Sequence, residues 1–426
     1  MANGWAGLDV TKLKLKGHHL ITGDKRMSVI AHATHKILMY SHDTYGLGHI
    51  RRTLAIARSL RKQPVNILIL TGSPLVGRFN IPSRIDFVRI PGMIKVTNDQ
   101  YQPLSIKLDA AEVLEIRKNI ILATAKSFRP DFFIVDKAPL GLKREIVDTL
   151  HWLKTDLPSC KSVLGLRDIM DSAAITIEEW EGKGIYEAME HLYHEIWVYG
   201  CREFYDPVVE YRIPPRVASK IHFTGYIPRQ IPSAEETRSV RAELGISHDQ
   251  KVLLLTTGGG GDGYPVLNTF LQALEQNLLP ANLRVVIVTG PFISKRHFPE
   301  VARRCQQSGF IALKFHRYME ALIGAANVVV SMGGYNTVCE IISQRKPFLI
   351  VPRTVPREEQ LIRAQVLCRT GFCDYLHPDH LTPKALWEKL SHLLINGSSY
   401  SEKMAAFPLK ALEIIRERVF RQTTGD

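Results

Sequence analysis

The sequence predicts an α/β protein of two domains, each a doubly wound parallel sheet with helices on both faces. First, 426 residues are too many for one ordinary hydrophobic core. Second, short and almost continuous apolar runs alternate with helical segments from residue 36 onward, which is typical of parallel strands buried on both faces. Third, each half of the chain opens with an apolar run that leads into a glycine-rich turn and then a helix.

In the first half, the predicted strands cover 36–41, 65–72, 85–91, 131–136, 161–166 and 195–200. Helical segments are predicted from about Ile50, over 110–128 and over 144–155. The first of these helices places Ile50, Leu54 and Ala57 on one face, which is the spacing of a buried stripe.

The second half repeats this architecture, with strands predicted at 251–257, 284–290, 311–316, 326–334 and 347–352 and helices from about Pro265 and over 335–344. A stretch rich in proline and polar residues, 210–233, is interpreted as the connection between the domains. The predicted organisation is a polar, basic N-terminal extension (1–35), two Rossmann-like domains (36–222 and 223–405) and a closing helix (406–426). Because ligands bind beyond the carboxyl ends of parallel strands, we expect the two domains to face each other across a cleft.

Composition narrows the classes of partner. Lysine and arginine exceed aspartate and glutamate by 55 − 42 = 13, which favours an anionic membrane surface or a phosphorylated ligand. The charge is not accompanied by a zinc-finger or RNA-recognition signature, so nucleic acid is disfavoured. Six scattered cysteines without a C-x-x-C pair, and no apolar run of the roughly 20 residues that a membrane span needs, predict reduced thiols and a cytoplasmic protein.

The strongest local signal lies at 331–365. A buried strand ends at Gly333 and Gly334, and a helix begins at about Tyr335. Glycines at such a junction expose backbone N–H groups, and the helix N-terminus adds partial positive charge, which together suit a diphosphate. Glu340, about a turn and a half into the helix, can accept hydrogen bonds from a ribose diol; the alternative is a tight turn with a solvated glutamate.

Two further features concern phosphate and metal chemistry. The run of four glycines (Gly258, Gly259, Gly260 and Gly261) precedes a helix and permits close backbone approach to a ligand, although a merely flexible loop is the alternative. It lacks the G-K-[ST] ending of a P-loop, which disfavours ATP hydrolysis of that type. The chain contains no D-x-D triplet, so no metal site is predicted.

His49 is the leading candidate for a catalytic base. It follows Gly48 at the start of the first helix, and its ordinary pKa near neutrality suits proton transfer. Asp43 and Asp136 are its rivals, and Asp136 ends a predicted strand and therefore points towards the cleft. Arg51 and Arg52 are predicted to contact acceptor phosphate or, alternatively, to form a solvated helix face.

The segment "SMGGYNTVCEIISQRKPFLIVPR", followed by "PREEQLIRAQ", and the turn "YGLGHIRR" resemble family 28 of the two-domain GT-B glycosyltransferases. The resemblance covers about residues 36–405. It implies that Gly333 and Gly334 face the donor diphosphate, that Glu340 holds the ribose, and that Gln360 holds the transferred sugar. It also places a short segment beside the uracil base: Phe315, His316, Arg317 and Tyr318. Tyr335 and Asn336 are implied to lie on the donor side as well.

The resemblance implies inverting transfer of a sugar from a nucleotide-diphosphate donor, with uridine as the expected base, to an acceptor hydroxyl. The missing D-x-D triplet and the two glycine–helix junctions predict that this transfer is metal-independent. The nucleotide-sugar is a co-substrate, and no cofactor is expected. The N-terminal domain would then take the acceptor, through Gly48, Arg51 and Arg52, and the C-terminal domain the donor. Alternatives are a UDP-sugar 2-epimerase, which shares the fold, and a non-catalytic sugar-nucleotide-binding protein. The turn before His49 is poorer in glycine than is usual in the family, so the resemblance does not identify the acceptor. Two alternatives remain: a lipid at an anionic membrane, and a soluble phosphorylated or polysaccharide molecule.

Overall fold

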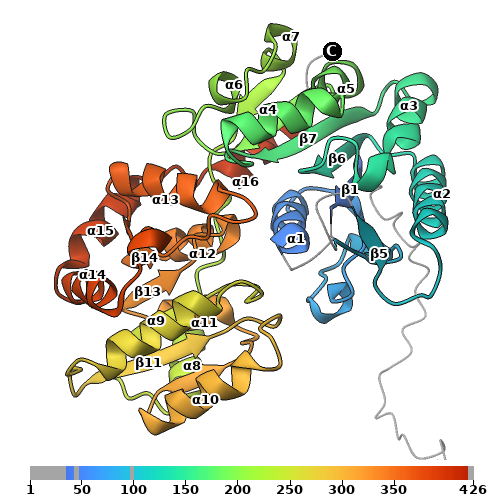
Figure 1. Ribbon diagram of the computed structural model, residues 1–426. Coiled ribbons are helices and arrows are strands. Elements are labelled where there is room, and N and C mark those ends of the chain that lie inside the picture. Colours follow the sequence, from blue (N-terminus) through green and yellow to red (C-terminus); the bar gives the residue numbers. More distant parts are fainter. Residues whose placement is uncertain (1–34, 43–47, 96–99, 421–426) are drawn as a thin grey trace, which may run out of the picture. The chain divides into compact units, whose positions relative to one another are not determined.

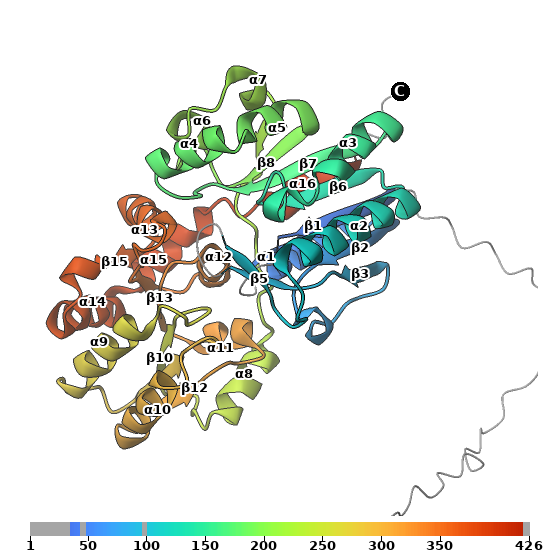
Figure 2. The same ribbon diagram turned by 45° about the vertical axis from the view of Figure 1, so that its right-hand side comes forward.

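The computed structural model describes residues 35–42, 48–95 and 100–420, and two parallel sheets form its core (Figure 1). All of these residues belong to one compact unit, Thr34–Asp426. The predicted extension lies, apart from His35, outside the described residues, and Asp43 does too. Turning the molecule by 45° shows helices on both faces of each sheet (Figure 2), so the predicted fold class is confirmed.

The first sheet has seven strands in the order β3-β2-β1-β6-β7-β8-β9, and every neighbouring pair is parallel. Its strands are β1 (His35–Ser41), β2 (Val65–Thr71), β3 (Ile85–Arg89), β6 (Phe132–Asp136), β7 (Lys161–Arg167), β8 (Glu195–Tyr199) and β9 (Ile221–Phe223). The chain reverses its direction across the sheet between β1 and β6. Such a switch point opens a crevice at the carboxyl ends of the two strands.

Alternation of side chains along β1 explains why both faces are covered. Ile37 and Met39 pack in one cluster with α1 (Gly48–Leu60), whereas Leu38 and Tyr40 pack in another with α2 (Ala110–Phe128). The remaining elements of this half are α3 (Val147–Asp156), α4 (Ala173–Gly182), α5 (Ile185–Leu192), α6 (Pro207–Glu210), α7 (Pro215–Ala218) and the antiparallel hairpin β4 (Met93–Lys95) and β5 (Tyr101–Pro103).

The second sheet has six parallel strands in the order β12-β11-β10-β13-β14-β15, with its switch point between β10 and β13. The strands are β10 (Lys251–Thr256), β11 (Leu283–Val288), β12 (Ile311–Leu313), β13 (Val328–Ser331), β14 (Phe348–Ile350) and β15 (Asp374–Tyr375). The helices are α8 (Ala234–Glu243), α9 (Tyr264–Glu275), α10 (His297–Gln307), α11 (Met319–Ala325), α12 (Tyr335–Ser343), α13 (Glu359–Arg369), α14 (Pro383–Asn396) and α15 (Ser398–Lys403).

Two segments differ from the sequence prediction. The stretch 210–233 is not all connection, because α7 and β9 lie within it and the buried Ile221 lets β9 join the first sheet. The closing helix begins later than expected: Pro408 interrupts it, since proline disfavours a helical residue before it, and α16 begins at Ala411 and reaches Phe420, the last described residue. α16 packs against α1.

The chain crosses between the two sheets twice, and the crossings are hydrogen-bonded to each other. The N–H of Tyr226 donates to the carbonyl of Pro408 at 2.8 Å, and the N–H of Ala411 donates to the carbonyl of Tyr226 at 3.3 Å. No helix among the described residues is long and apolar enough to span a membrane. All six cysteines are free thiols.

Candidate active site

His49 and Asp136 meet at the switch point of the first sheet. Asp136 is the last residue of β6, and His49 lies in the first turn of α1, which follows the neighbouring strand β1. The Nδ1 atom of His49 lies 2.5 Å from Oδ2 of Asp136. The two candidates for the base are therefore partners in one hydrogen bond, although 87 positions separate them in the sequence.

Arg52, one turn along α1, completes this group. Its guanidinium donates to both oxygens of Asp136, from Nε at 2.7 Å and from Nη2 at 2.8 Å. Burial alone would raise the pKa of the Asp136 carboxyl, but the charge of Arg52 and the hydrogen bonds from Arg52 and His49 hold it below its ordinary value. Nη2 of Arg52, which only donates, also lies 3.1 Å from Nδ1 of His49, but the carboxylate oxygen, which only accepts, is closer at 2.5 Å. We therefore assign the ring proton to Nδ1, which leaves a lone pair on Nε2 of the neutral ring.

The His49 ring is neutral at physiological pH. Burial lowers its pKa from 6.5 to about 4, in spite of the opposing effect of the Asp136 carboxylate. His42, which follows β1, packs edge-on against this ring at 5.7 Å between ring centroids. A neutral imidazole that is oriented by a carboxylate and has a free nitrogen is the arrangement of a general base.

This lowered pKa predicts a pH dependence. We expect kcat/KM to fall only as the pH drops towards about 4, rather than near 6.5, because the base must be unprotonated. The stability that neutral His49 contributes is fully present above its unfolded pKa of about 6.5 and is lost as the pH falls towards the folded value, since the unfolded state takes up the proton first. A pH profile of kcat/KM checks this, and an acid limb near pH 6.5 would contradict it.

The predicted diphosphate site lies at the N-terminus of α12. Among the described residues, no side chain caps this nine-residue helix, and a Cβ added to Gly334 would meet no atom within 4 Å. Gly333 has a φ of 78°, and a Cβ there would lie 2.7 Å from Ile350 Cγ2. In the part of the chain that the structure describes, the first N–H groups of α12 are therefore suited to an anion.

The glycine run after β10 forms the matching turn at the other side of this switch point. Gly258 and Gly260 have φ values of 66° and 87°, which favour glycine. A Cβ at Gly260 would lie 2.1 Å from the carbonyl oxygen of Thr289, so the turn packs directly against the backbone that follows β11. Gly258, Gly259 and Gly261 are exposed.

The segment expected to meet the uracil base has exposed rings. Phe315 and Tyr318 are each 54% exposed, and the Arg317 guanidinium lies over the Tyr318 ring. His316 is buried instead, and its Nδ1 accepts a hydrogen bond from the N–H of Tyr318 at 3.2 Å. His316 therefore shapes this loop, and the exposed rings remain available for stacking.

Glu340 has an unexpected partner. It is 2% exposed, and its Oε1 lies 2.8 Å from Nη2 of Arg51, in an ionic contact whose geometry is not that of a hydrogen bond. Arg51 also donates to Glu320 at 2.6 Å. Burial raises the pKa of Glu340 although Arg51 lowers it. In this structure Arg51 occupies the contact with Glu340 that the resemblance assigns to the ribose.

The other predicted residues take polar or packing roles. The Asn336 side chain donates to the carbonyl of Gly48 at 2.8 Å, which brings the N-termini of α12 and α1 together. Gln360 accepts from the N–H of Arg353 at 3.2 Å. The Tyr335 ring is buried against Tyr226 and does not face a ligand.

Arg51 and Arg52 are both paired with carboxylates, so in this structure neither forms the predicted solvated face or is free for an acceptor phosphate. Two other cations were missed: Lys137, directly after β6, and Arg167, the last residue of β7. The sequence carried a partial signal for them, because each lies at the carboxyl end of a predicted buried strand.

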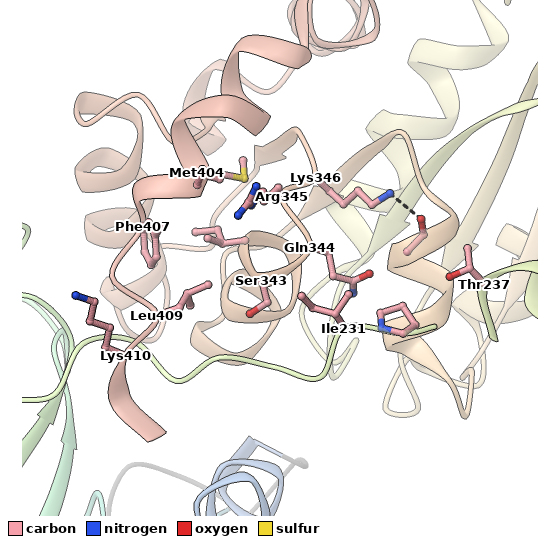
Figure 3. Close-up of a pocket in the computed structure, with 14 residues that line it drawn as sticks. Ile231, Thr237, Ser343, Gln344, Arg345, Lys346, Met404, Phe407, Leu409 and Lys410 are labelled. Atoms are coloured by element: carbon pink, nitrogen blue, oxygen red, sulfur yellow. Dashed lines mark hydrogen bonds between the residues drawn. The ribbon is translucent and has the colours of Figure 1, made fainter. Parts of the chain in front are cut away.

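A cavity of about 610 Å³ lies elsewhere in the chain (Figure 3). Ile231, Gln344, Arg345, Lys346 and Lys410 are among the residues that line it. None of the predicted site residues lines this cavity, so it is separate from the His49 group.

Comparison with known proteins identifies a family domain in the C-terminal half of the chain. Residues 253–419 match the glycosyltransferase family 28 C-terminal domain. The chain is 27% identical over 169 residues to the UDP-N-acetylglucosamine--N-acetylmuramyl-(pentapeptide) pyrophosphoryl-undecaprenol N-acetylglucosamine transferase of Clostridium kluyveri, a match that covers 39% of this chain and 45% of that relative. A second such relative is covered to 56%, so the chain spans about half the length of the curated relatives it matches.

Solved structures extend the likeness to nearly the whole chain. Acinetobacter baumannii MurG superimposes with a TM-score of 0.58 at 15% identity, covering 91% of this chain and 99% of that one. The UDP-GlcNAc 2-epimerase of Neisseria meningitidis, bound to UDP-GlcNAc, gives 0.59 at 14% identity and covers 91% and 100%. At these identities the likeness shows the fold alone. Residues 253–419 therefore resemble the C-terminal domain of glycosyltransferase family 28, and the two parallel sheets have the GT-B fold.

Proposed function

We propose that this protein is a glycosyltransferase that moves a sugar from a UDP-sugar to an acceptor hydroxyl, with inversion and without a metal ion. The observation that carries the proposal is the hydrogen bond between His49 and Asp136 at the switch point of the first sheet. The family 28 domain in the C-terminal half supports the reaction class. The hydrogen bond between Asn336 and Gly48 supports a base and a donor site that are close together.

The proposed reaction is a single displacement. Nε2 of His49 takes the proton of the acceptor hydroxyl, and Asp136 stabilises the imidazolium that forms. The hydroxyl oxygen bonds to the anomeric carbon as the bond from that carbon to the diphosphate oxygen breaks. The leaving UDP gains charge, and the N–H groups at the start of α12 and in the turn 258–261 stabilise it.

Release of UDP tests this proposal. The protein is incubated with a panel of UDP-sugars and candidate acceptors, and free UDP and sugar epimers are measured in the same samples. A glycosyltransferase releases UDP. Epimer formation without UDP would identify the protein as a 2-epimerase, and binding without either product would identify a sugar-nucleotide-binding protein. Thermal shift selects the donor beforehand, because a ligand at 100 times its Kd adds about 2.7 kcal/mol of stability.

Metal independence predicts resistance to chelation. We expect turnover to be unchanged after EDTA treatment, because helix and loop N–H groups neutralise the diphosphate in this proposal. Initial rates before and after EDTA, with magnesium or manganese added back, measure this. Activity that disappears with EDTA and returns with either metal would contradict it.

Donor binding should depend on Glu340. Replacing it with glutamine removes a charged acceptor, and hydrogen bonds to charged groups contribute about 1.5–3 kcal/mol, so we expect donor affinity to fall about 10- to 100-fold. Glu320→Gln is the matched control, because Glu320 shares the Arg51 contact but has no proposed contact with the donor. Equal donor affinity in both variants would refute the role of Glu340.

The acceptor is proposed only as a hydroxyl compound. The name of the Clostridium kluyveri relative, with its pyrophosphoryl-undecaprenol group, supports a lipid-linked acceptor. The net charge of +13 supports peripheral contact of a cytoplasmic protein with an anionic membrane. Sedimentation with anionic vesicles at low and high salt distinguishes this from a soluble acceptor.

A further inference from the structure

Two cations beside the proposed base have no carboxylate partner. Among the described residues, no carboxylate oxygen lies within 4.0 Å of the charged nitrogens of Lys137 or Arg167. The Nε atom of Arg167 is buried without a hydrogen-bond partner. Both side chains are half-buried, so they remain accessible from the carboxyl edge of the sheet.

Of the cations that act on Lys137 and Arg167, Arg52 and Arg357 are paired with carboxylates, whereas Arg363 lies 3.9 Å from Asp168 and its Nη2 has no hydrogen-bond partner among the described residues. Arg52 contacts Asp136 at 2.7 Å, Arg353 contacts Glu359 at 2.7 Å, and Arg357 contacts Glu179 at 3.3 Å. Glu359 is the carboxylate that acts on both Lys137 and Arg167, but it is already bonded to Arg353. A positive excess therefore remains at the ends of β6 and β7.

The backbone holds the two cations close together. The N–H of Lys137 donates to the carbonyl of Gly165 in β7 at 2.7 Å, two residues before Arg167. Lys137 has a φ of 68°, in the left-handed region that is unfavourable for a side chain other than glycine. Lys137 thus holds an unfavourable backbone conformation, and such conformations are common at functional sites.

Burial and neighbouring cations lower the pKa of both groups. Burial, Arg167 and Arg357 together lower the pKa of Lys137 to about 7. Burial lowers the pKa of Arg167 to about 10, and Arg363 and Arg52 add to this effect. A bound anion would remove the repulsion and give both cations a charge-assisted hydrogen-bond partner.

We propose that Lys137 and Arg167 form a phosphate-binding subsite beside His49 that selects an acceptor with a phosphate group close to the reacting hydroxyl. The role of the subsite in acceptor choice rests on the proposed function. Lys137 directly follows Asp136, the partner of His49, and both cations belong to the half of the chain opposite the family 28 domain. The diphosphate of the donor is the other phosphate group that these two cations could bind.

Binding of inorganic phosphate tests the subsite. Titration calorimetry on the full chain, with and without saturating UDP, compares the wild type with Lys137→Gln and Arg167→Gln. We expect each substitution to weaken phosphate binding at least tenfold and to leave UDP binding unchanged. Lys137→Arg should retain binding because it keeps the charge, and Lys118→Gln, which alters a lysine paired with Glu115 on α2, should have no effect.

Each other outcome counts against part of the proposal. UDP binding that weakens in the same variants would overturn the assignment to the acceptor and assign the cations to the donor diphosphate. Phosphate binding that is absent in the wild type, or equal in every folded variant, would overturn the subsite. If no UDP-sugar releases UDP but the two variants still lose phosphate, the proposed function fails and the subsite stands.

Discussion

Replacing His49 with alanine should lower kcat about 10²- to 10⁴-fold, the range typical of a lost general base. The Kd for UDP should stay close to that of the wild type, because His49 lies in the half of the chain opposite the proposed donor site. Initial-rate kinetics together with UDP titration measure the two effects separately. The result depends on Nε2 of His49 being the atom that takes the proton.

The matched control is His191→Ala, which alters an exposed histidine on α5 and should leave kcat unchanged. A near-normal kcat for His49→Ala would mean that the base is misassigned. Asp43, which lies outside the described residues, would then be the next candidate.

Replacing Asp136 with asparagine should lower both activity and stability. The substitution leaves the Arg52 guanidinium, which is 2% exposed, without its carboxylate. Removing one partner of a buried ion pair costs about 3–5 kcal/mol, so we expect the free energy of unfolding to fall by about that amount. Denaturant unfolding measures this, and the kcat of the folded variant reports the lost orientation of His49.

Glu115→Gln is the control for stability, because it breaks the exposed pair with Lys118 and such pairs contribute only about 0–1 kcal/mol. Equal losses of unfolding free energy in the two variants would show that the buried pair of Arg52 and Asp136 contributes no more to stability than an exposed pair. A large loss of stability with unchanged kcat would show that Asp136 is structural only.

The sequence predicted most of the two sheets, because their strands are nearly continuous apolar runs and α1 carries a clear buried stripe. It did not predict β9, which is three residues long and follows two prolines in a stretch that has the composition of a linker. The helix expected at the C-terminal end was predicted to begin too early, although Pro408 marks the break before Ala411.

Sequence reasoning treated His49 and Asp136 as rivals because it could not know which strands are neighbours. Their contact depends on β1 pairing with the distant strand β6 on one side, in addition to β2 on the other. The pairing of Arg51 with Glu340 was also out of reach, since it joins residues from the two halves. Lys137 and Arg167 resemble solvated surface cations until the strand order brings them together.

Single-turnover release of UDP by the wild type and by His49→Ala, at equal occupancy by the UDP-sugar selected by thermal shift, tests the central claim most directly. The wild type should release UDP only together with a glycosylated acceptor, and the variant should release it about 10²- to 10⁴-fold more slowly. Release at equal rates by both proteins, or conversion of the donor to its epimer without free UDP, would contradict the claim.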